Sequence, residues 1–351
     1  MTDKATPKRH SRKGLYAPFI LLLVLLAGWT GWWFFLTRQI ETRLEAQAET
    51  MRGRGWTIDY ADPSISGWPF RARVALPHAS ITAPSGHAVA APELVAEANA
   101  YQPTRWVVVA PDGLTLTRAA KGKVNVRGDA VRMSVHGLDQ RWPNLALELV
   151  NPVFTPHPEA EPFPIARAGR VELYSRPHVA GGVTAADDVD VLFRLIDAQG
   201  RPAGPVEGFA QQGRLTLQIE TVLEDASRLR ASGSDGLFAA WTRAGGRFTQ
   251  VRGEMSAGQS RATLSSDELR AEADGRIAGQ VALKAEQPLR AIAGLARSGE
   301  GTVNRLGATG AAAAAGAADA TGQGDVQLTL LFRDGRTWLG PFPIAPAPKL
   351  F

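Results

Sequence analysis

An uncharged apolar run near the N-terminus constrains this chain more than any other feature. Residues 15–36 read LYAPFILLLVLLAGWTGWWFFL and contain no acid, lysine, arginine or histidine. A helix rising about 1.5 Å per residue would make this run roughly 33 Å long, which is enough to cross the hydrocarbon layer of a bilayer. The run therefore predicts a single transmembrane helix over residues 15–36, and this helix decides where the rest of the chain folds.

The flanks of the run indicate its orientation. Residues 1–14 form a basic tail with five lysines and arginines against one acid, Asp3. By the positive-inside rule this tail stays in the cytoplasm and the body is translocated, which for a bacterial inner-membrane protein means a periplasmic domain. A cleaved signal peptide is the alternative, but its apolar core spans about 7–15 residues and precedes a small-residue site. Here the run is longer and ends in WWFFL, which favours an uncleaved anchor.

Composition narrows the classes of partner. The net charge is +5, and residues 1–14 supply most of it, so the remainder is nearly neutral and offers no basic surface for nucleic acid. The chain has no cysteine, which excludes disulfides, thiolate catalysis and cysteine-ligated metals. We therefore expect the membrane, phospholipid or envelope proteins as partners, and no nucleic acid.

The periodicity of apolar residues changes soon after the apolar run. Ile40, Leu44, Ala48 and Met51 recur at helical spacing, which predicts a juxtamembrane amphipathic helix over residues 37–55. From residue 56 onward, short segments such as NLALELV and DVDVLFRLID alternate apolar and polar side chains. One buried face and one wet face are typical of antiparallel sheets.

We therefore predict a mainly β periplasmic domain over residues 56–298. It is a large antiparallel sheet, open, curved or sandwich-like, with a few short helices. Two strand sets meet near residue 230, and the sequence leaves open whether they share one sheet. Short helices are predicted around Trp241 in GLFAAWTRAGG and within QPLRAIAGLARSG, because each has an apolar stripe closed by glycine.

The C-terminal part has a different composition. Residues 299–324 are rich in glycine and alanine and carry no stripe of large apolar residues, so we expect a mobile loop there. Alanine has the best helix propensity, which makes a helix the alternative. Residues 325–351 predict a closing β-hairpin followed by a proline-rich end that cannot pair regularly.

The search for chemistry finds no catalytic constellation. The six histidines form no metal-binding pair, the pattern G-x-S-x-G is absent, and no glycine-rich loop has phosphate-binding context. Ser134, His136 and Asp139 are close in sequence, but a catalytic trio needs residues that converge from separate elements. We predict a non-enzymatic protein with no catalytic, metal-binding or cofactor-binding residues and no cofactor.

Two motifs stand out for their structural chemistry. One is SGWPFR at residues 66–71, and the other is DGRTWLGP at residues 334–341. Glycine permits unusual backbone angles, proline fixes φ, and the aromatic rings offer large buried area. We interpret both as packed corners, with an aromatic ligand clamp as the functional alternative. With the helix tryptophan, the structural candidates are Gly67, Trp68, Pro69, Phe70, Trp241, Asp334, Gly335, Trp338, Gly340 and Pro341.

These features together resemble a known family. A basic tail, one membrane helix, an amphipathic helix ending near Gly55-Trp56 and then SGWPFR before a β-meander resemble the bacterial envelope proteins catalogued as domain of unknown function 2125. The Trp-bearing helix, the strand starting at Gly245-Gly246, the ADG hairpin and the closing DGR…LGPFPI segment are similar too. The resemblance spans nearly the whole chain and implies no catalytic residues.

The layout also resembles, more distantly, the AsmA-like inner-membrane proteins. Their single N-terminal helix and long periplasmic sheet with an apolar face imply lipid binding or transfer, although the Ala- and Arg-rich C-terminal strands would interrupt such a face here. Two functions follow as hypotheses: a protein that binds lipid or another apolar ligand on its sheet, and a scaffold for envelope assembly through protein–protein contacts. A hydrolase with a dispersed site is the weakest reading, because no catalytic group can be named.

Overall fold

The computed structural model describes residues 13–229, 236–298, 303–319 and 326–350. Its strands form one 20-stranded sheet whose neighbouring strands all pair antiparallel, so the prediction of a mainly β, antiparallel fold is confirmed. One long helix, α1 (Lys13–Arg52), precedes the sheet. It joins the predicted transmembrane and juxtamembrane segments without a break.

The N-terminal strands are β1 (Thr57–Asp59), β2 (Ser64–Ser66), β3 (Arg71–Thr82), β4 (His87–Asn99), β5 (Gln102–Val109), β6 (Leu114–Arg118), β7 (Lys123–Arg127), β8 (Ala130–His136), β9 (Asn144–Val150), β10 (Val153–Pro156) and β11 (Ile165–Arg167). The later strands are β12 (Arg170–Ala180), β13 (Val183–Gly200), β14 (Leu215–Leu223), β15 (Arg247–Ala257), β16 (Ser260–Ala271), β17 (Ile277–Glu286), β18 (Val326–Arg333), β19 (Arg336–Leu339) and β20 (Phe342–Pro346). The shorter helices are α2 (Pro205–Phe209), α3 (Leu237–Arg243), α4 (Pro288–Arg297) and α5 (Arg305–Asp319), with 3-10 turns η1 (Ala119–Lys121) and η2 (Ala226–Arg228).

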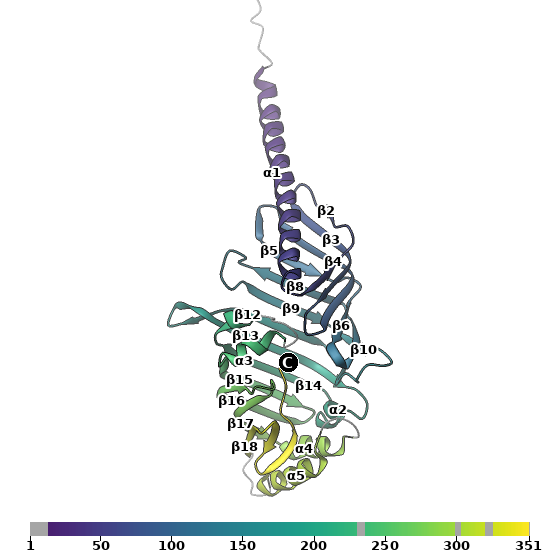
Figure 1. Ribbon diagram of the computed structural model, residues 1–351, viewed down its shortest axis with the longest axis vertical. Coiled ribbons are helices and arrows are strands. Elements are labelled where there is room, and N and C mark those ends of the chain that lie inside the picture. The colour runs from purple at the N-terminus through teal and green to yellow at the C-terminus, as the bar shows by residue number, and fades with distance from the viewer. Residues whose placement is uncertain (1–12, 230–235, 299–302, 320–325, 351) are drawn as a thin grey trace, which may run out of the picture.

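The strands lie across the long axis of the molecule and are stacked along it, as Figure 1 shows. The helix α1 runs along that axis, crosses β3 to β5 and projects beyond the end of the sheet that carries β2. Helices α4 and α5 lie at the opposite end, and the C-terminus returns to the middle of the sheet. The sheet therefore extends away from the projecting part of α1.

The sheet forks between β4 and β13. Strand β3 occupies one edge of β4, so β5 and β6 share the other edge, pairing with residues 95–99 and 87–90 respectively. One branch continues through β8, β9 and β12, and the other through β7, β10 and β11. The branches rejoin at β13, which pairs with both β12 and β11.

A hydrophobic core fills the space between the two branches. Val124 and Val126 of β7 and Phe154 of β10 pack against Val131 and Leu149 of the other branch. Phe154 and Phe163 stack with ring centroids 4.8 Å apart. Local alternation on both branches directs these side chains inward, so this part of the domain is a two-layer sandwich inside a longer open sheet.

The two predicted strand sets belong to one sheet. Strand β14 ends before residue 230 and β15 begins after it, yet they pair from Leu215↔Ala257 to Leu223↔Phe248, with one register shift between Glu220 and Val222. Residues 230–235 lie outside the described residues. The predicted helices around Trp241 and within QPLRAIAGLARSG are present as α3 and α4.

The expectation of a mobile loop over residues 299–324 was wrong for its central part. Residues 305–319 form the helix α5, whose methyl groups Ala308, Ala311, Ala312 and Ala315 are buried against α4 and β20. The buried face of α5 consists of these alanines. A search of the sequence for large apolar residues at helical spacing therefore does not detect it. A Cβ on Gly310 would lie 2.5 Å from the Phe342 ring, so glycine is needed where the helix meets β20.

The closing hairpin has one strand more than predicted. Strand β18 turns at Asp334-Gly335 into β19, and a second turn at Gly340 leads to β20, which pairs back on β19. The proline-rich end beyond Pro346 makes an isolated bridge between Lys349 and Arg276, as expected for a segment that cannot pair regularly.

Enlarging a buried alanine of α5 tests its docking. We expect Ala311→Leu to lower the free energy of unfolding by about 1–3 kcal/mol, because the extra carbons overpack a filled interface. Ala313, which is exposed on the same helix, is the matched control. Ala313→Leu should change stability by no more than about 0.5 kcal/mol. Urea unfolding of the detergent-solubilised chain measures both, and equal values for the two variants would contradict the docked helix.

Candidate functional site

One face of the sheet carries an in-register row of apolar residues from end to end. Each member lies directly opposite the next across β2 to β5, β8, β9 and β12 to β18. At about 4.8 Å per strand the row is roughly 58 Å long. We call it the central row, and its members are Ile65, Val74, Ala96, Val108, Met133, Leu147, Leu173, Phe193, Ile219, Gly253, Leu264, Leu283 and Leu328.

Gly253 is the only member of this row without a side chain, and a neighbour covers the gap. A Cβ at Gly253 would lie 3.0 Å from Cδ1 of Leu264, the residue opposite on β16. The leucine side chain therefore leans over the glycine. The apolar surface continues across β15 although the strand contributes no side chain of its own at this position.

A second apolar row runs beside the central row on the same face. We call it the flanking row, and its members are Val131, Leu149, Val171, Leu195, Leu217, Met255, Ala262, Ala285 and Val326. The other branch of the fork covers its first members, and α2 covers the stretch around Leu195 and Met255. The flanking row thus serves as core.

The central row is less covered than the flanking row. In its middle, Met133 and Leu173 are 37% and 42% exposed, and the adjacent Leu145 is 39% exposed. On the side away from α2, the cluster of Trp241, Phe238 and Leu223 packs over the strand ends. The described residues therefore leave a strip of apolar side chains open between covered margins.

The opposite face of the same strands is polar. The residues between the two apolar rows form a third line across the sheet: Arg132, Glu148, Glu172, Arg194, Gln218, Glu254, Thr263, Lys284 and Gln327. Glu172 is buried and accepts ion pairs from Arg194 at 3.0 Å and Arg170 at 3.3 Å. Burial, and then the charge of Glu172, raises the pKa of Tyr174 beside it. This face is stabilised by charge pairs, whereas the other is stabilised by apolar contact.

The helix α1 closes the central row at one end. Trp33 and Leu36 are buried against Ala72 of β3 and Trp106 of β5. The indole nitrogens of three tryptophans donate to backbone carbonyls of the sheet: Trp29 to Pro69 at 2.7 Å, Trp33 to Arg71 at 2.8 Å and Trp32 to Ala100 at 3.2 Å. These bonds fix the rotation of α1, because all three donors must face the same edge of the sheet.

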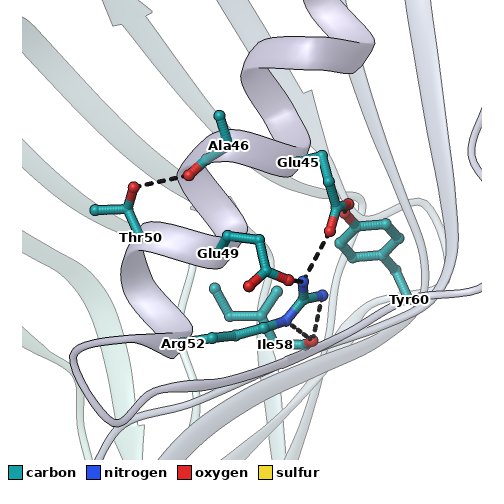
Figure 2. A network of polar contacts seen from close by, with 7 residues as sticks. All are labelled: Glu45, Ala46, Glu49, Thr50, Arg52, Ile58 and Tyr60. Carbon is teal, nitrogen blue, oxygen red and sulfur yellow. Dashed lines mark hydrogen bonds and ion pairs between the residues drawn. The ribbon is translucent and has the colours of Figure 1, made fainter.

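A polar network fixes the last turns of α1 (Figure 2). Arg52 donates to Glu45 at 2.9 Å, to Glu49 at 2.6 Å and to the carbonyl of Ile58 in β1. Tyr60 donates to Glu45 at 2.7 Å. The hydrogen bond from Tyr60, followed by that from Arg52, lowers the pKa of Glu45, and the two carboxylates raise the pKa of Arg52. The helix end and the first strand thus form one unit.

Helices α4 and α5 close the other end of the row. Leu328 and Leu330 of β18 pack against Ile292 of α4 and Ala312 of α5. Helix α4 also approaches α2 closely, since a Cβ at Gly294 would fall on the carbonyl oxygen of Gly208. The central row therefore ends under helices at both ends and is open between them.

The polar face holds a pocket of about 670 Å³, which contains several groups that sequence inspection had raised. Ser134, His136 and Asp190 all line it, but Asp190 accepts from His178 at 2.6 Å and Arg176 at 3.0 Å. Asp187 and Asp188 accept from backbone N–H groups of the η2 turn. Among the described residues, no group of histidines and carboxylates is arranged to hold a metal ion.

The structure places the SGWPFR motif at the edge where α1 meets the sheet. Gly67 has φ +101°, and a Cβ there would lie 2.8 Å from the Arg71 carbonyl oxygen, so the turn requires glycine. The Trp68–Pro69 bond is cis. Trp68 and Phe70 are 49% and 66% exposed, so the interpretation of this motif as a packed corner was wrong.

The other structural candidates lie far from that edge. Trp241 is fully buried and donates to the Glu224 carbonyl at 2.6 Å, with Phe238 edge-on against it. Asp334 and Gly335 form the β18–β19 turn, and Gly340 and Pro341 form the next turn. Trp338 lies under the guanidinium of Arg333 at 5.3 Å. The structure does not bring these residues together with the SGWPFR motif.

Comparison with known proteins identifies the chain at the level of family. Residues 33–348 match the family described as an uncharacterized protein conserved in bacteria, DUF2125. The chain belongs to the DUF2125 family. No curated protein and no solved structure matches it. The match begins at Trp33, so the last of the three docking tryptophans and the rest of α1 fall within the DUF2125 region, whereas Trp29, Trp32 and the projecting part precede it.

Sequence inspection of this DUF2125 chain missed the central row as a unit. Alternation was visible within single strands, but the row depends on which residues pair across strands. The available signal was the alternation of apolar and polar residues within single segments, such as those around Leu147 and Phe193.

Neutralising Glu45 tests the network at the end of α1. Because the folded-state pKa of Glu45 is lowered, its contribution to stability is present above the ordinary carboxylate range, near about pH 4.3, and is lost as pH falls through the folded pKa. We expect Glu45→Gln to lower the melting temperature at pH 7 and the two proteins to converge in acid. Thermal unfolding against pH measures this.

Glu41, exposed one turn earlier on α1, provides the control. Glu41→Gln should track the unsubstituted protein at every pH. A Glu45→Gln variant that keeps the same deficit in acid as at pH 7 would contradict a role for the ionised carboxylate.

Proposed function

We propose that this DUF2125 protein is a non-enzymatic, membrane-anchored protein that holds the acyl chains of phospholipid, or a similar apolar envelope ligand, along its central row. The observation that carries the proposal is the unbroken, partly open line of apolar side chains across the sheet. The AsmA-like layout noted from the sequence points to the same class of ligand. On the polar face, Glu172, Asp190 and His178 are engaged in ion pairs, which supports binding rather than catalysis.

The free energy of removing apolar surface from water favours a ligand bound on the exposed strip of the central row. Each square ångström of apolar surface removed from water contributes about 25 cal/mol. Contiguous exposed apolar patches on soluble surfaces are small and, where larger, mark interaction sites. Met133, Leu145 and Leu173 lie side by side on β8, β9 and β12 with their side chains open, so an acyl chain placed along the row would cover all three.

Charge distribution supports lipid rather than a polar ligand for this face. Across β8 to β18 the central and flanking rows hold only apolar side chains and one glycine, so they offer no partner to a hydrogen-bonding ligand. A polar ligand placed there would lose its water without compensation. The headgroup of a bound lipid would instead reach the polar strand ends.

An anchor in the membrane would hold the protein next to the phospholipid that it binds. The segment Tyr16–Arg52 is long and apolar enough to include a bilayer span. If the basic tail stays in the cytoplasm, as the positive-inside rule predicts, the sheet lies in the periplasm and is anchored in the bacterial inner membrane. Since the sheet is stacked along the direction of α1 (Figure 1), the central row then leads away from the membrane surface.

Photo-crosslinking from lipid tests the binding face. We expect the full-length protein, in vesicles that contain a phospholipid with a photoreactive acyl chain, to form adducts on Met133, Leu145 and Leu173. Mass spectrometry of the digested protein locates the adducts. Adducts confined to the projecting part of α1, or spread equally over both faces of the sheet, would contradict the proposal.

A charge placed on the row should abolish these adducts. Leu173→Asp should lower the yield about tenfold or more, because contact of an ionised carboxylate with an acyl chain costs more than the ~1.4 kcal/mol that a tenfold change represents. Val107 is the matched control, since it is 41% exposed against 42% for Leu173 but points to the opposite face. Val107→Asp should leave the yield unchanged.

A reporter fusion tests the orientation. Alkaline phosphatase folds to an active form outside the cytoplasm, so a fusion after Phe351 should be active in cells. The same enzyme fused before residue 1 is the matched control, and it should be inactive. The reverse pattern would show that the basic tail is translocated and would remove the periplasmic placement.

A scaffold role is the second candidate, favoured by one feature. The hairpin of β12 and β13 projects sideways from the stack in Figure 1, and its Val179 and Val183 are 54% and 72% exposed. A projecting apolar hairpin tip is suited to contact with an envelope protein. Crosslinks from Val183 to a partner protein, together with an absence of lipid adducts on the central row, would favour this role.

A further inference from the structure

The projecting part of α1 is too short to cross a bilayer without help from the docked part. Residues 16–28 are exposed throughout, and at about 1.5 Å per residue they span roughly 20 Å. The hydrocarbon layer is about 30 Å thick. The three helical residues before Tyr16 add only about 4.5 Å, and the first of them is Lys13. The rest of the span must come from the turns that begin at Trp29.

Those same turns are the ones that bind the sheet. Trp29, Trp32 and Trp33 donate to the carbonyls of Pro69, Ala100 and Arg71. If α1 crosses the bilayer, the β2–β3 loop and the β4–β5 turn are carried to the depth at which hydrocarbon gives way to headgroups. The sheet edge and the end of the span cannot be separated without breaking these bonds.

The exposed side chains of this edge are suited to that depth. Trp68 and Phe70 of the β2–β3 loop and Tyr101 of the β4–β5 turn are 49%, 66% and 67% exposed. The Ala100 N–H donates to the Phe70 carbonyl at 2.8 Å, so the two loops adjoin. Tryptophan and tyrosine favour the interfacial region because their rings are apolar and their tips are polar.

The backbone carbonyls of this edge have hydrogen-bond donors within the protein, so they do not depend on water. Unpaired carbonyls are costly near hydrocarbon. Here the carbonyls of Pro69, Ala100 and Arg71 accept indole N–H groups, and that of Phe70 accepts a backbone N–H. Arg71 N–H in turn donates to the Gly67 carbonyl at 2.9 Å. A loop edge exposed only to water would not need such satisfaction.

We infer that the sheet edge formed by the β2–β3 loop and the β4–β5 turn inserts into the interfacial layer of the bilayer, with Trp68, Phe70 and Tyr101 as its lipid contacts. This inference rests on the membrane anchoring proposed above and adds a second attachment to the membrane. It also sets the orientation of the β domain relative to the membrane, because a single membrane helix leaves the protein free to rotate and tilt in the bilayer. The central row then begins at the lipid surface, at Ile65 in β2.

Depth-dependent quenching tests this insertion in the full-length chain. The chain has no cysteine, so single cysteines can carry a fluorophore without background. We choose Phe70→Cys and Tyr101→Cys at the edge, Leu23→Cys in the exposed helix, and Leu306→Cys, 87% exposed on α5 at the far end, as the control. The labelled proteins are reconstituted in vesicles of phosphatidylethanolamine and phosphatidylglycerol that contain lipids with a spin label near the headgroup or deep in the acyl chain.

Each outcome decides between the proposals. We expect the shallow quencher to remove most of the fluorescence at positions 70 and 101, the deep quencher to act at position 23, and neither to act at position 306. Quenching at 23 without quenching at 70 and 101 would overturn the insertion and leave the anchor standing. An unquenched label at 23 would overturn the anchor, and the insertion with it.

Discussion

The structure depends on one constraint: the strand register keeps apolar side chains on one face of the long sheet and polar side chains on the other, from one strand to the next. From β8 to β18, each apolar residue of the central and flanking rows faces another apolar residue, and the line between them on the opposite face is polar. A slip of one residue anywhere would bring a charged residue such as Glu172 into the apolar face. Register shifts do occur, for example between Leu195 and Ala198 of β13 and between Ser265 and Leu269 of β16, but the paired residues of the two rows lie outside them. The two faces therefore stay distinct along the whole stack.

Much of the fold was predictable because its signals are local. The apolar run, the change of period after residue 56, the turn residues and the stripes of α3 and α4 each lie within a few residues, and each led to the observed element. The fork at β4 was not predictable, because it depends on which half of one edge pairs with β5 and which with β6. The helix α5 was only the alternative to a mobile loop, because the sequence does not show which partner its alanine methyls contact, here β20 and α4.

The candidate site shows the same division between local and long-range information. The alternation within single strands predicted an apolar face. The sequence did not show that Met133, Leu147 and Leu173 would lie in one line, or that some of their side chains would stay exposed. The SGWPFR motif was recognised, but its rings were expected inside a corner. Its exposure follows from α1: the carbonyls of Pro69 and Arg71 turn toward the helix tryptophans, and the rings of Trp68 and Phe70 remain on the surface.

In the proposed anchoring, the geometry of α1 links the membrane to the apolar face. The strands cross the direction of α1 and are stacked along it, so a path along the helix and a path along the central row share one direction (Figure 1). Had the strands run parallel to α1, a row of paired residues would lie in the plane of the membrane, and only side chains at strand ends would differ in distance from it. With the strands crossing α1, each step along the row of an anchored protein would move about 4.8 Å farther from the bilayer. Burial of Trp33 and Leu36 on Ala72 and the network around Arg52 hold this crossing in place, so the direction of the row is set by contacts at one end of the sheet.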